Sequence, residues 1–230
     1  ERTPAKLSPT PPDLDRLREL YAHLEFKTWL SELGGTQGIG SDRTSQLTEY
    51  DIILDGPLLE SWINRLESAA YFALDTETTS LNVMQAELVG MSFADEVGRA
   101  AYLPFAHDYV GAPAQLQRES TLERLRPLLE NEDVIKVGQN LKYDRSVLLN
   151  HGIQLRGIRF DTMLESYVLN STASRHDMDS LALKHLGYNT ITFEEIAGKG
   201  KSQLSFNEIE LEKAGPYAAE DADITLRLHQ

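Results

Sequence analysis

The fold and the candidate site of this chain are both set by the stretch Phe72-Ala73-Leu74-Asp75-Thr76-Glu77-Thr78. Its first residues continue an apolar run that starts at Ala70, which predicts a buried strand. Asp75 and Glu77 close that strand two residues apart, so both carboxylates point to the same face of a sheet. Hard divalent cations such as Mg²⁺ prefer oxygen ligands of this kind. We therefore expect a metal site at the end of this strand.

Two further acidic residues belong to the argument although they lie far away in the sequence. Asp144 follows Gln139-Asn140-Leu141-Lys142-Tyr143 in the first turn of a predicted helix, where acidic residues are common. Asp221 lies four residues after Tyr217, so the two share one helix face. Four converging carboxylates would repel one another by about 4 kcal/mol per pair at 4 Å. A protein that brings them together needs a bound cation.

Charge and composition limit the class of protein. Acidic residues outnumber basic ones 36 to 22, which opposes binding to long stretches of duplex. The same charge is compatible with an enzyme that gathers carboxylates around cations and holds only a few terminal nucleotides. Cysteine is absent, which excludes disulfides and thiolate metal sites. No apolar run approaches 18 residues, so no membrane partner is expected.

The order of predicted elements indicates an α/β domain that follows a tail. We expect residues 1–49 to form the tail, with a proline-rich start, a helix over 14–33 and a flexible glycine-rich linker. In the domain, residues 50–230, strands are expected at 71–75, 88–94, 99–103, 134–137 and 158–160. Helices are expected at 58–66, 116–129, 141–150, 161–170, 178–185 and from about 207 towards 229. Pro216 should either kink the last helix or begin a new one.

Residues 50–230 resemble the 3′–5′ proofreading exonuclease domain of bacterial DNA polymerase I, of family A. The resemblance is carried by the stretch at 72–78, by Val137-Gly138-Gln139-Asn140-Leu141-Lys142-Tyr143-Asp144 and by Tyr217-Ala218-Ala219-Glu220-Asp221-Ala222-Asp223. Segments 160–164, 175–181 and 191–196 match as well. The fold that this implies is ribonuclease H-like, with a central mixed β-sheet flanked by helices. The tail resembles the end of the family's 5′-nuclease region, and the polymerase domain that follows in the family lies outside this sequence, so we expect a piece of a longer protein.

The resemblance also implies an activity and its residues. The family hydrolyses the 3′-terminal phosphodiester of DNA and releases nucleoside 5′-monophosphates. The resemblance implies two bound divalent cations, with Mg²⁺ as the expected ion and Mn²⁺ or Zn²⁺ as alternatives. Their expected ligands are Asp75, Glu77, Asp144 and Asp221. Tyr217 takes the position of the tyrosine that, with Glu77, orients the attacking water, which places the chain in the tyrosine branch of the DEDD exonucleases. The expected DNA contacts are Leu81, Thr78, Gln139, Asn140, Tyr143, Arg175 and Phe193.

Partners follow from the same resemblance, and two alternatives stay open. The expected substrate is a single-stranded or frayed 3′ end of DNA, and the expected protein partners are the polymerase domain and the 5′-nuclease region. The expected location is the bacterial cytoplasm, at the nucleoid. A ribonuclease D-like enzyme that trims RNA shares the carboxylates and the tyrosine. A catalytically inactive DNA-binding scaffold is the second alternative, and the retained carboxylates argue against it. Asp223 points away from the Tyr217–Asp221 face and is expected to be structural.

Overall fold

The computed structural model describes residues 12–24, 26, 29, 33, 48–172 and 175–230. The chain divides into two units, Glu1–Gln46 and Leu47–Gln230. In the first unit, α1 spans Leu14–His23, and the rings of Tyr21, Phe26 and Trp29 contact one another. The helix expected over 14–33 is therefore interrupted after His23. Trp29 and Leu33 are again helical, and residues 25, 27–28 and 30–32 lie outside the described residues.

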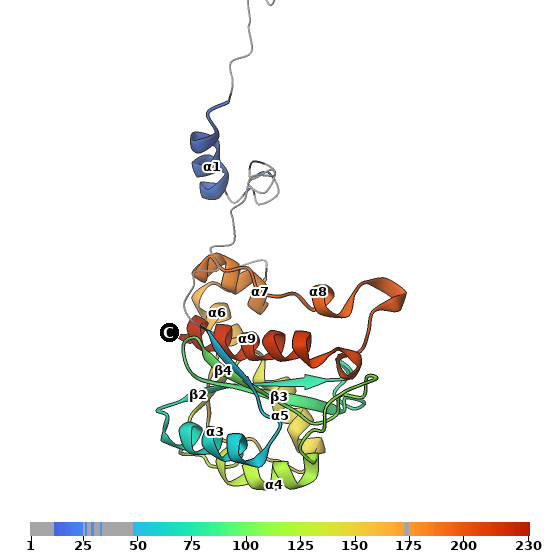
Figure 1. The fold of residues 1–230 in the computed structure, drawn as a ribbon. Helices are drawn as coiled ribbons and strands as arrows, with labels where there is room; N and C mark the ends of the chain where they lie inside the picture. The colour runs from blue at the N-terminus through green and yellow to red at the C-terminus, as the bar shows by residue number, and fades with distance from the viewer. Residues whose placement is uncertain (1–11, 25, 27–28, 30–32, 34–47, 173–174) are drawn as a thin grey trace, which may run out of the picture. The chain divides into compact units, whose positions relative to one another are not determined.

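The second unit is built on a mixed sheet that has six strands within the described residues (Figure 1). The strand order is β1-β4-β3-β2-β5-β6, and the strands are β1 (Glu49–Ile52), β2 (Phe72–Thr78), β3 (Leu88–Glu96), β4 (Arg99–Pro104), β5 (Lys136–Gly138) and β6 (Ile158–Asp161). The pairs β2–β3 and β3–β4 are antiparallel, whereas β1–β4, β2–β5 and β5–β6 are parallel. The five expected strands are present with shifted ends. The sequence analysis missed β1, an edge strand of only four residues.

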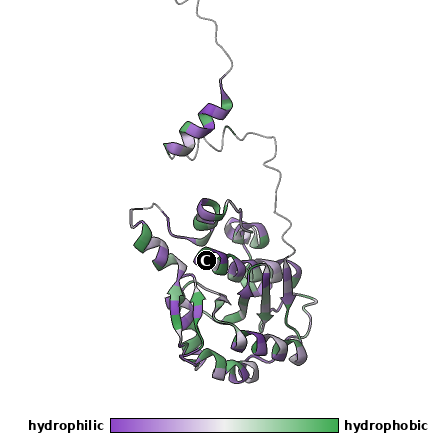
Figure 2. Ribbon diagram, turned by 90° about the vertical axis from the view of Figure 1, so that its left-hand side faces the viewer, coloured by the Kyte–Doolittle hydropathy of each residue, from purple (hydrophilic) through white to green (hydrophobic). Residues whose placement is uncertain are grey.

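Alternating side chains of β2 divide the core between the two faces of the sheet. Phe72 and Leu74 pack with the buried residues of α3 (Gly56–Ser68), α4 (Arg118–Leu129) and α5 (Leu141–Asn150). Ala73 packs on the opposite face with Ala219 and Ala222 of α9 (Leu211–His229). In Figure 1, α3 and α4 lie on one side of the sheet and α9 on the other. Hydrophilic and hydrophobic residues alternate along these helices (Figure 2), as expected for helices that bury one face.

Short helices connect β6 to α9. They are α6 (Thr162–Leu169), α7 (Met178–Leu181), a π-helical turn (Ala182–Leu186), α8 (Phe193–Ala197) and two 3₁₀ turns, Gly200–Ser202 and Phe206–Glu208. The helix expected at 178–185 is thus α7 continued by the π-helical turn. Within the described ranges, no helix has both the length and the apolar character needed to cross a membrane.

The last helix runs without a break through Pro216, so no new helix begins there. Pro216 is the sixth residue of α9, past the first turn, so its missing N–H removes one backbone hydrogen bond of the helix. The neighbouring Gly215 allows α9 to approach the sheet closely, because a Cβ at this position would lie 2.6 Å from Cδ1 of Ile52 in β1. The close approach brings the polar residues of α9 to the end of β2.

Candidate metal centre

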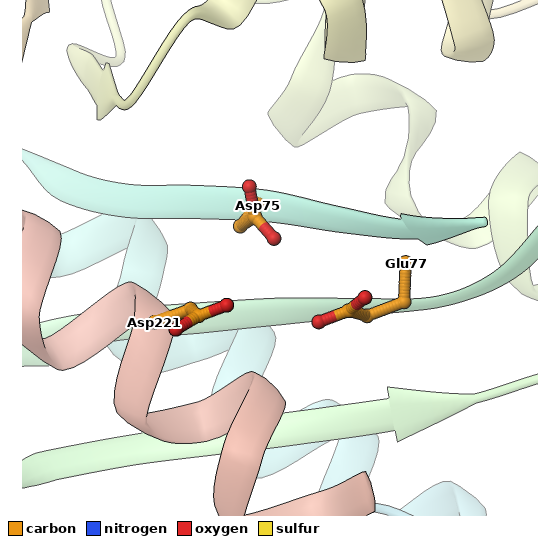
Figure 3. Close-up of side chains that lie close together, drawn as sticks. All are labelled: Asp75, Glu77 and Asp221. Carbon is orange, nitrogen blue, oxygen red and sulfur yellow. The ribbon is translucent and has the colours of Figure 1, made fainter. Parts of the chain in front are cut away.

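Three carboxylates meet where β2 passes beneath α9. Asp75 and Glu77 extend from β2 and Asp221 extends from α9 into the same space (Figure 3). One carboxylate oxygen of each residue lies within 4.8 Å of the other two. Asp75 and Glu77 follow Ala73 at intervals of two residues, which places them on the α9 face of the sheet. The strand and the helix therefore bring together acids that are 144 residues apart in the sequence.

Burial and mutual repulsion make this cluster unfavourable as three bare anions. Burial raises the pKa of Glu77, and the charges of Asp75, Asp221 and Asp144 raise it further. Burial likewise raises the pKa of Asp221, with the Asp75 charge as the next cause. The pKa of Asp75 is raised by burial and then by the charge of Asp144. A divalent cation would favour the ionised carboxylates and so oppose these increases in pKa.

One atom of the cluster fits a cation particularly well. Oε1 of Glu77 is buried and has no hydrogen-bond partner among the residues that the structure describes. Buried carboxylate oxygens normally have such a partner, because desolvation without one is costly. Oxygen donors that carry negative charge are also what Mg²⁺ prefers. The three side chains therefore fit a divalent cation in both chemistry and geometry.

Asp144 lies outside this group of three. It is 2% exposed, and its Oδ1 accepts hydrogen bonds from the backbone N of Thr76 at 3.0 Å and from Thr76 Oγ1 at 2.6 Å. Burial raises the pKa of Asp144 to about 6, and the hydrogen bonds from Thr76 oppose that increase. Thr76 alternates with Asp75 and Glu77 along β2, so its side chain points toward α5. Asp144 thus affects the cluster through its charge, on Asp75 and Glu77.

Tyr217 lies one turn before Asp221 on α9 and faces the cluster. Its phenol lies close enough to Asp221 for each group to affect the pKa of the other. Burial raises the pKa of Tyr217, followed by the charges of Asp221, Glu77 and Asp75, so the phenol stays protonated at neutral pH. The ring centroids of Phe193 and Phe206 lie 6.3 Å and 6.0 Å from that of Tyr217. Tyr217 is therefore a fixed donor beside the carboxylates.

Several of the residues expected to contact DNA lie around the end of β2. Tyr143 of α5 has its hydroxyl 2.5 Å from Thr78 Oγ1 and donates to the Ser80 carbonyl at 2.5 Å. These contacts fix the loop that follows β2 and presents Leu81, which is 94% exposed. Arg175 is also exposed. Thr78 and Tyr143 hold the loop, while Leu81 and Arg175 are accessible to a ligand.

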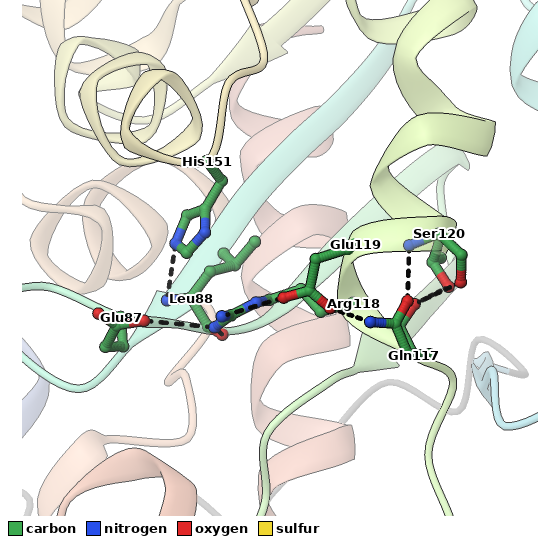
Figure 4. Close-up of polar contacts among 8 residues, drawn as sticks. Glu87, Leu88, Gln117, Arg118, Glu119, Ser120 and His151 are labelled. Atoms are coloured by element: carbon green, nitrogen blue, oxygen red, sulfur yellow. Dashed lines mark hydrogen bonds and ion pairs between the residues drawn. The ribbon is translucent and has the colours of Figure 1, made fainter.

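The far end of the Leu81 loop is held where β3 begins (Figure 4). His151 Nε2 accepts a hydrogen bond from the backbone N of Leu88 at 3.3 Å. Arg118 pairs with Glu87 at 3.3 Å and donates to the Leu88 carbonyl at 3.4 Å. Burial lowers the pKa of His151, which favours the neutral imidazole that can accept. Both ends of the loop are therefore anchored to the domain.

Gln139 and Asn140 have partners within the chain. Gln139 Nε2 donates to the His176 carbonyl at 2.8 Å, and its Oε1 accepts from the Thr162 hydroxyl. Asn140 has a φ of 61°, and its backbone N donates to Asp161 Oδ1 at 3.1 Å. The Gln139 amide thus holds two neighbouring segments together, a role that the sequence does not indicate.

Two other acids of α9 have structural roles. Glu220 is buried and accepts hydrogen bonds from the Tyr188 hydroxyl and from the backbone N of Ile191, both at 2.6 Å. Glu220 therefore anchors the segment that leads into α8 to the helix α9. The sequence analysis did not predict this role. Asp223 is fully buried and accepts from the Tyr50 hydroxyl at 2.7 Å. The prediction that Asp223 is structural is confirmed.

Comparison with known proteins adds the following findings. The profile of a family described as 3′–5′ exonuclease matches residues 50–230. DNA polymerase I of Pseudomonas aeruginosa is 54% identical over an alignment of 233 positions, which covers 98% of this chain and 26% of that protein. The chain therefore spans about a quarter of the length of this relative.

Solved structures share the fold. RNase D of Escherichia coli, an exoribonuclease involved in structured RNA processing, matches with a TM-score of 0.56 and 17% identity, over 79% of this chain and 43% of its own. NrnC of Brucella melitensis with bound Mg²⁺ matches with a TM-score of 0.51 and 18% identity, over 78% of this chain and 76% of its own. These likenesses confirm the predicted ribonuclease H-like fold.

Proposed function

The chain belongs to the 3′–5′ exonuclease family that occurs in DNA polymerase I, and from this premise we propose that it hydrolyses the terminal phosphodiester at the 3′ end of DNA. The observation that carries the proposal is the group of three carboxylates within 4.8 Å, with one oxygen of Glu77 left without a partner in the described part of the chain. The products are nucleoside 5′-monophosphates, and the reaction removes mispaired nucleotides after polymerisation.

Two divalent cations, with Mg²⁺ as the first candidate, take part in the proposed reaction. Asp75, Glu77 and Asp221 would hold one of them, and Asp75 would hold the second with help from Asp144. Because Thr76 already occupies Oδ1 of Asp144, the contribution of Asp144 is its charge or its other oxygen. When bound, the cations lower the pKa of water and offset the charge that develops on the leaving 3′ oxygen.

The side chains of this chain orient the nucleophile. Glu77 would accept a hydrogen bond from the attacking water with the carboxylate oxygen that does not hold the cation. Tyr217 keeps its proton because its pKa is raised, so it is suited to orienting that water rather than to deprotonating it. The rings of Phe193 and Phe206 pack around its ring and hold the phenol beside the cluster. The geometry supports a water held between a strand residue and a helix residue.

Side chains on the loop after β2 and beside Tyr217 support a single-stranded substrate. Leu81 is 94% exposed on an anchored loop, and Phe193 is half-buried beside Tyr217. Stacking of terminal bases on such side chains contributes about 1–3 kcal/mol per base and tolerates any sequence. Arg175 supplies a positive charge for a phosphate. A frayed or mispaired end would reach this site more easily than a paired end.

The chain is proposed to act within a longer DNA polymerase I. Residues 50–230 would be the exonuclease domain, and residues 1–49 would form the end of the 5′-nuclease region with a linker. A polymerase domain would then supply the 3′ end that this domain corrects. The 54% identity to a DNA polymerase I supports DNA rather than RNA as the substrate.

Digestion of 3′-labelled oligonucleotides tests the proposal. The wild-type chain should release mononucleotides from single-stranded DNA with Mg²⁺ and none with EDTA. Asp221→Asn should lose this activity, whereas Glu212→Gln, an exposed change of equal charge on the same helix, should keep it. An RNA oligonucleotide of the same sequence separates the ribonuclease D-like alternative. Faster digestion of RNA than of DNA, or release that EDTA does not stop, would contradict the proposal.

A further inference from the structure

The threonine between the two carboxylates of β2 holds the fourth acid of the predicted site. Thr76 donates twice to Oδ1 of Asp144, from its backbone N at 3.0 Å and from its Oγ1 at 2.6 Å. Both residues are buried, so the two bonds lie away from solvent. Hydrogen bonds to an ionised carboxylate are shorter and stronger than those between neutral groups. A single residue therefore fixes the place of one oxygen of Asp144.

The shortness of β5 explains why the backbone N of Thr76 needs this acceptor. β5 has three residues and pairs with β2 at Phe72 and Ala73. The backbone N of Phe72 donates to the Ile135 carbonyl, and the N–H groups of alternate residues point to the same edge of a strand. The N–H of Thr76 therefore points to the edge of β2 that β5 no longer covers. Asp144 supplies the acceptor there, because a buried N–H without a partner is costly.

The hydroxyl of Thr76 is not needed to complete the sheet. The backbone N–H alone would satisfy this edge with any side chain, and valine has the same shape and a high preference for strands. The hydroxyl instead adds a second bond to the oxygen that the backbone already holds. Its contribution is therefore to the placement of the Asp144 carboxylate.

This placement connects the two faces of β2. Asp75 and Glu77 point toward α9, whereas Thr76 between them points toward α5. Asp144 lies close enough to Asp75 and Glu77 for its charge to raise the pKa of both. We propose that Thr76 is a positioning residue that holds the Asp144 carboxylate in place for the second of the two divalent cations. This role rests on the proposed function only for the use of that cation in catalysis.

Mn²⁺ binding measured by calorimetry tests the role of the hydroxyl. Thr76→Val keeps the branched shape and the backbone N–H but loses one of the two bonds, so the affinity of the weaker Mn²⁺ site should fall about tenfold. Thr76→Ser keeps the hydroxyl and should bind within about twofold of wild type. Thr121→Val is the matched control, because Thr121 is similarly buried but donates to the Gln117 carbonyl at the start of α4. This control should bind Mn²⁺ like the wild type.

A purely structural role of Thr76 predicts a different pattern. In that case Thr76→Val and Thr121→Val, which each lose one buried hydroxyl bond, would affect the urea midpoint in EDTA and the Mn²⁺ affinity alike. That result would overturn the inference, as would wild-type affinity in Thr76→Val or an affinity of Thr76→Ser as low as that of Thr76→Val.

Amide hydrogen exchange in EDTA gives a second test that does not need Thr76→Val to fold. The Thr76 amide should exchange about tenfold or more faster in Asp144→Ala than in the wild-type chain, because the bond to its acceptor is lost. Asp144→Asn retains an acceptor oxygen and should keep the amide protected. Equal exchange of the Thr76 amide in Asp144→Ala and the wild-type chain would show that Asp144 and Thr76 are not bonded, and would overturn the inference.

The outcomes separate this inference from the proposed function. If the wild-type chain binds two Mn²⁺ ions and Thr76→Val weakens one site, but DNA is not degraded, the proposed function fails and the role of Thr76 stands. If DNA is degraded with Mg²⁺ but Thr76→Val binds Mn²⁺ like the wild type, only the role of Thr76 fails. A wild-type chain that binds no divalent cation would contradict both.

Discussion

Neutralising one acid of the cluster should stabilise the cation-free protein. Three carboxylates within 4.8 Å form three repelling pairs, each worth about 3–4 kcal/mol at an effective dielectric near 20. Glu77→Gln removes two of these pairs, which sets an upper limit of about 7 kcal/mol. Protons taken up by groups with raised pKa values already relieve part of this repulsion. We therefore expect the free energy of unfolding in EDTA to rise by about 2–4 kcal/mol at about pH 8.

Urea unfolding followed by circular dichroism measures this effect. Mg²⁺ should stabilise the wild-type chain by about 2.7 kcal/mol at a hundredfold excess over its Kd, and should stabilise Glu77→Gln much less. The advantage of Glu77→Gln in EDTA would then shrink or reverse when Mg²⁺ is added. Glu212→Gln changes the net charge equally at an exposed position and should follow the wild type. If Glu77→Gln is no more stable than wild type in EDTA, or gains as much from Mg²⁺, the reasoning about the cluster is wrong.

Three further predictions concern the surroundings of the cluster. Asp144→Asn keeps an oxygen that can accept the hydrogen bonds from Thr76, so the variant should fold as stably as wild type. It should nevertheless cleave DNA about a hundredfold more slowly, because the charge is lost. Cleavage at the wild-type rate in single-turnover assays would contradict the role of that charge. The pKa of His107 lies below its ordinary value of 6.5 in the folded state, so below that pH the unfolded chain binds a proton that the folded chain does not. The free energy of unfolding should therefore fall as the pH decreases from about 6.5 to 5, and it should fall less steeply in His107→Asn. If urea unfolding gives the same dependence on pH for both proteins, this prediction is wrong. Gly90→Ala places a methyl group 2.2 Å from the Tyr102 hydroxyl and should cost about 1–3 kcal/mol in thermal unfolding, whereas Gly56→Ala, with open space around it, should cost far less.

Local periodicity predicted which residues of the candidate site share a face. The spacing of two between Asp75 and Glu77 fixes a common face of a strand, and the spacing of four between Tyr217 and Asp221 fixes a common face of a helix. Neither relation depends on the rest of the fold. The two faces meet because α9 packs across the sheet. Spacing alone does not determine this packing, and the expectation of it came from the family resemblance.

Features that depend on long-range partners could not be predicted from local patterns. The strand β1 alternates polar and apolar residues over only four positions, and it is a strand because it pairs with β4, about 50 residues away. The position of Asp144 in a first helical turn was predicted, but its engagement by Thr76 follows from α5 packing on the face opposite the cluster. His107 was expected only to be a surface or core histidine, because nothing nearby in the sequence indicates its bond to Ile209.

The central claim is that Asp75, Glu77 and Asp221 bind divalent cations, and anomalous diffraction from crystals soaked with Mn²⁺ tests it most directly. The account predicts a strong peak among these three carboxylates, with a second peak about 3.5–4 Å from it on the side of Asp144. Mn²⁺ peaks elsewhere in the crystal, with none within coordination distance of the three carboxylates, would contradict the account.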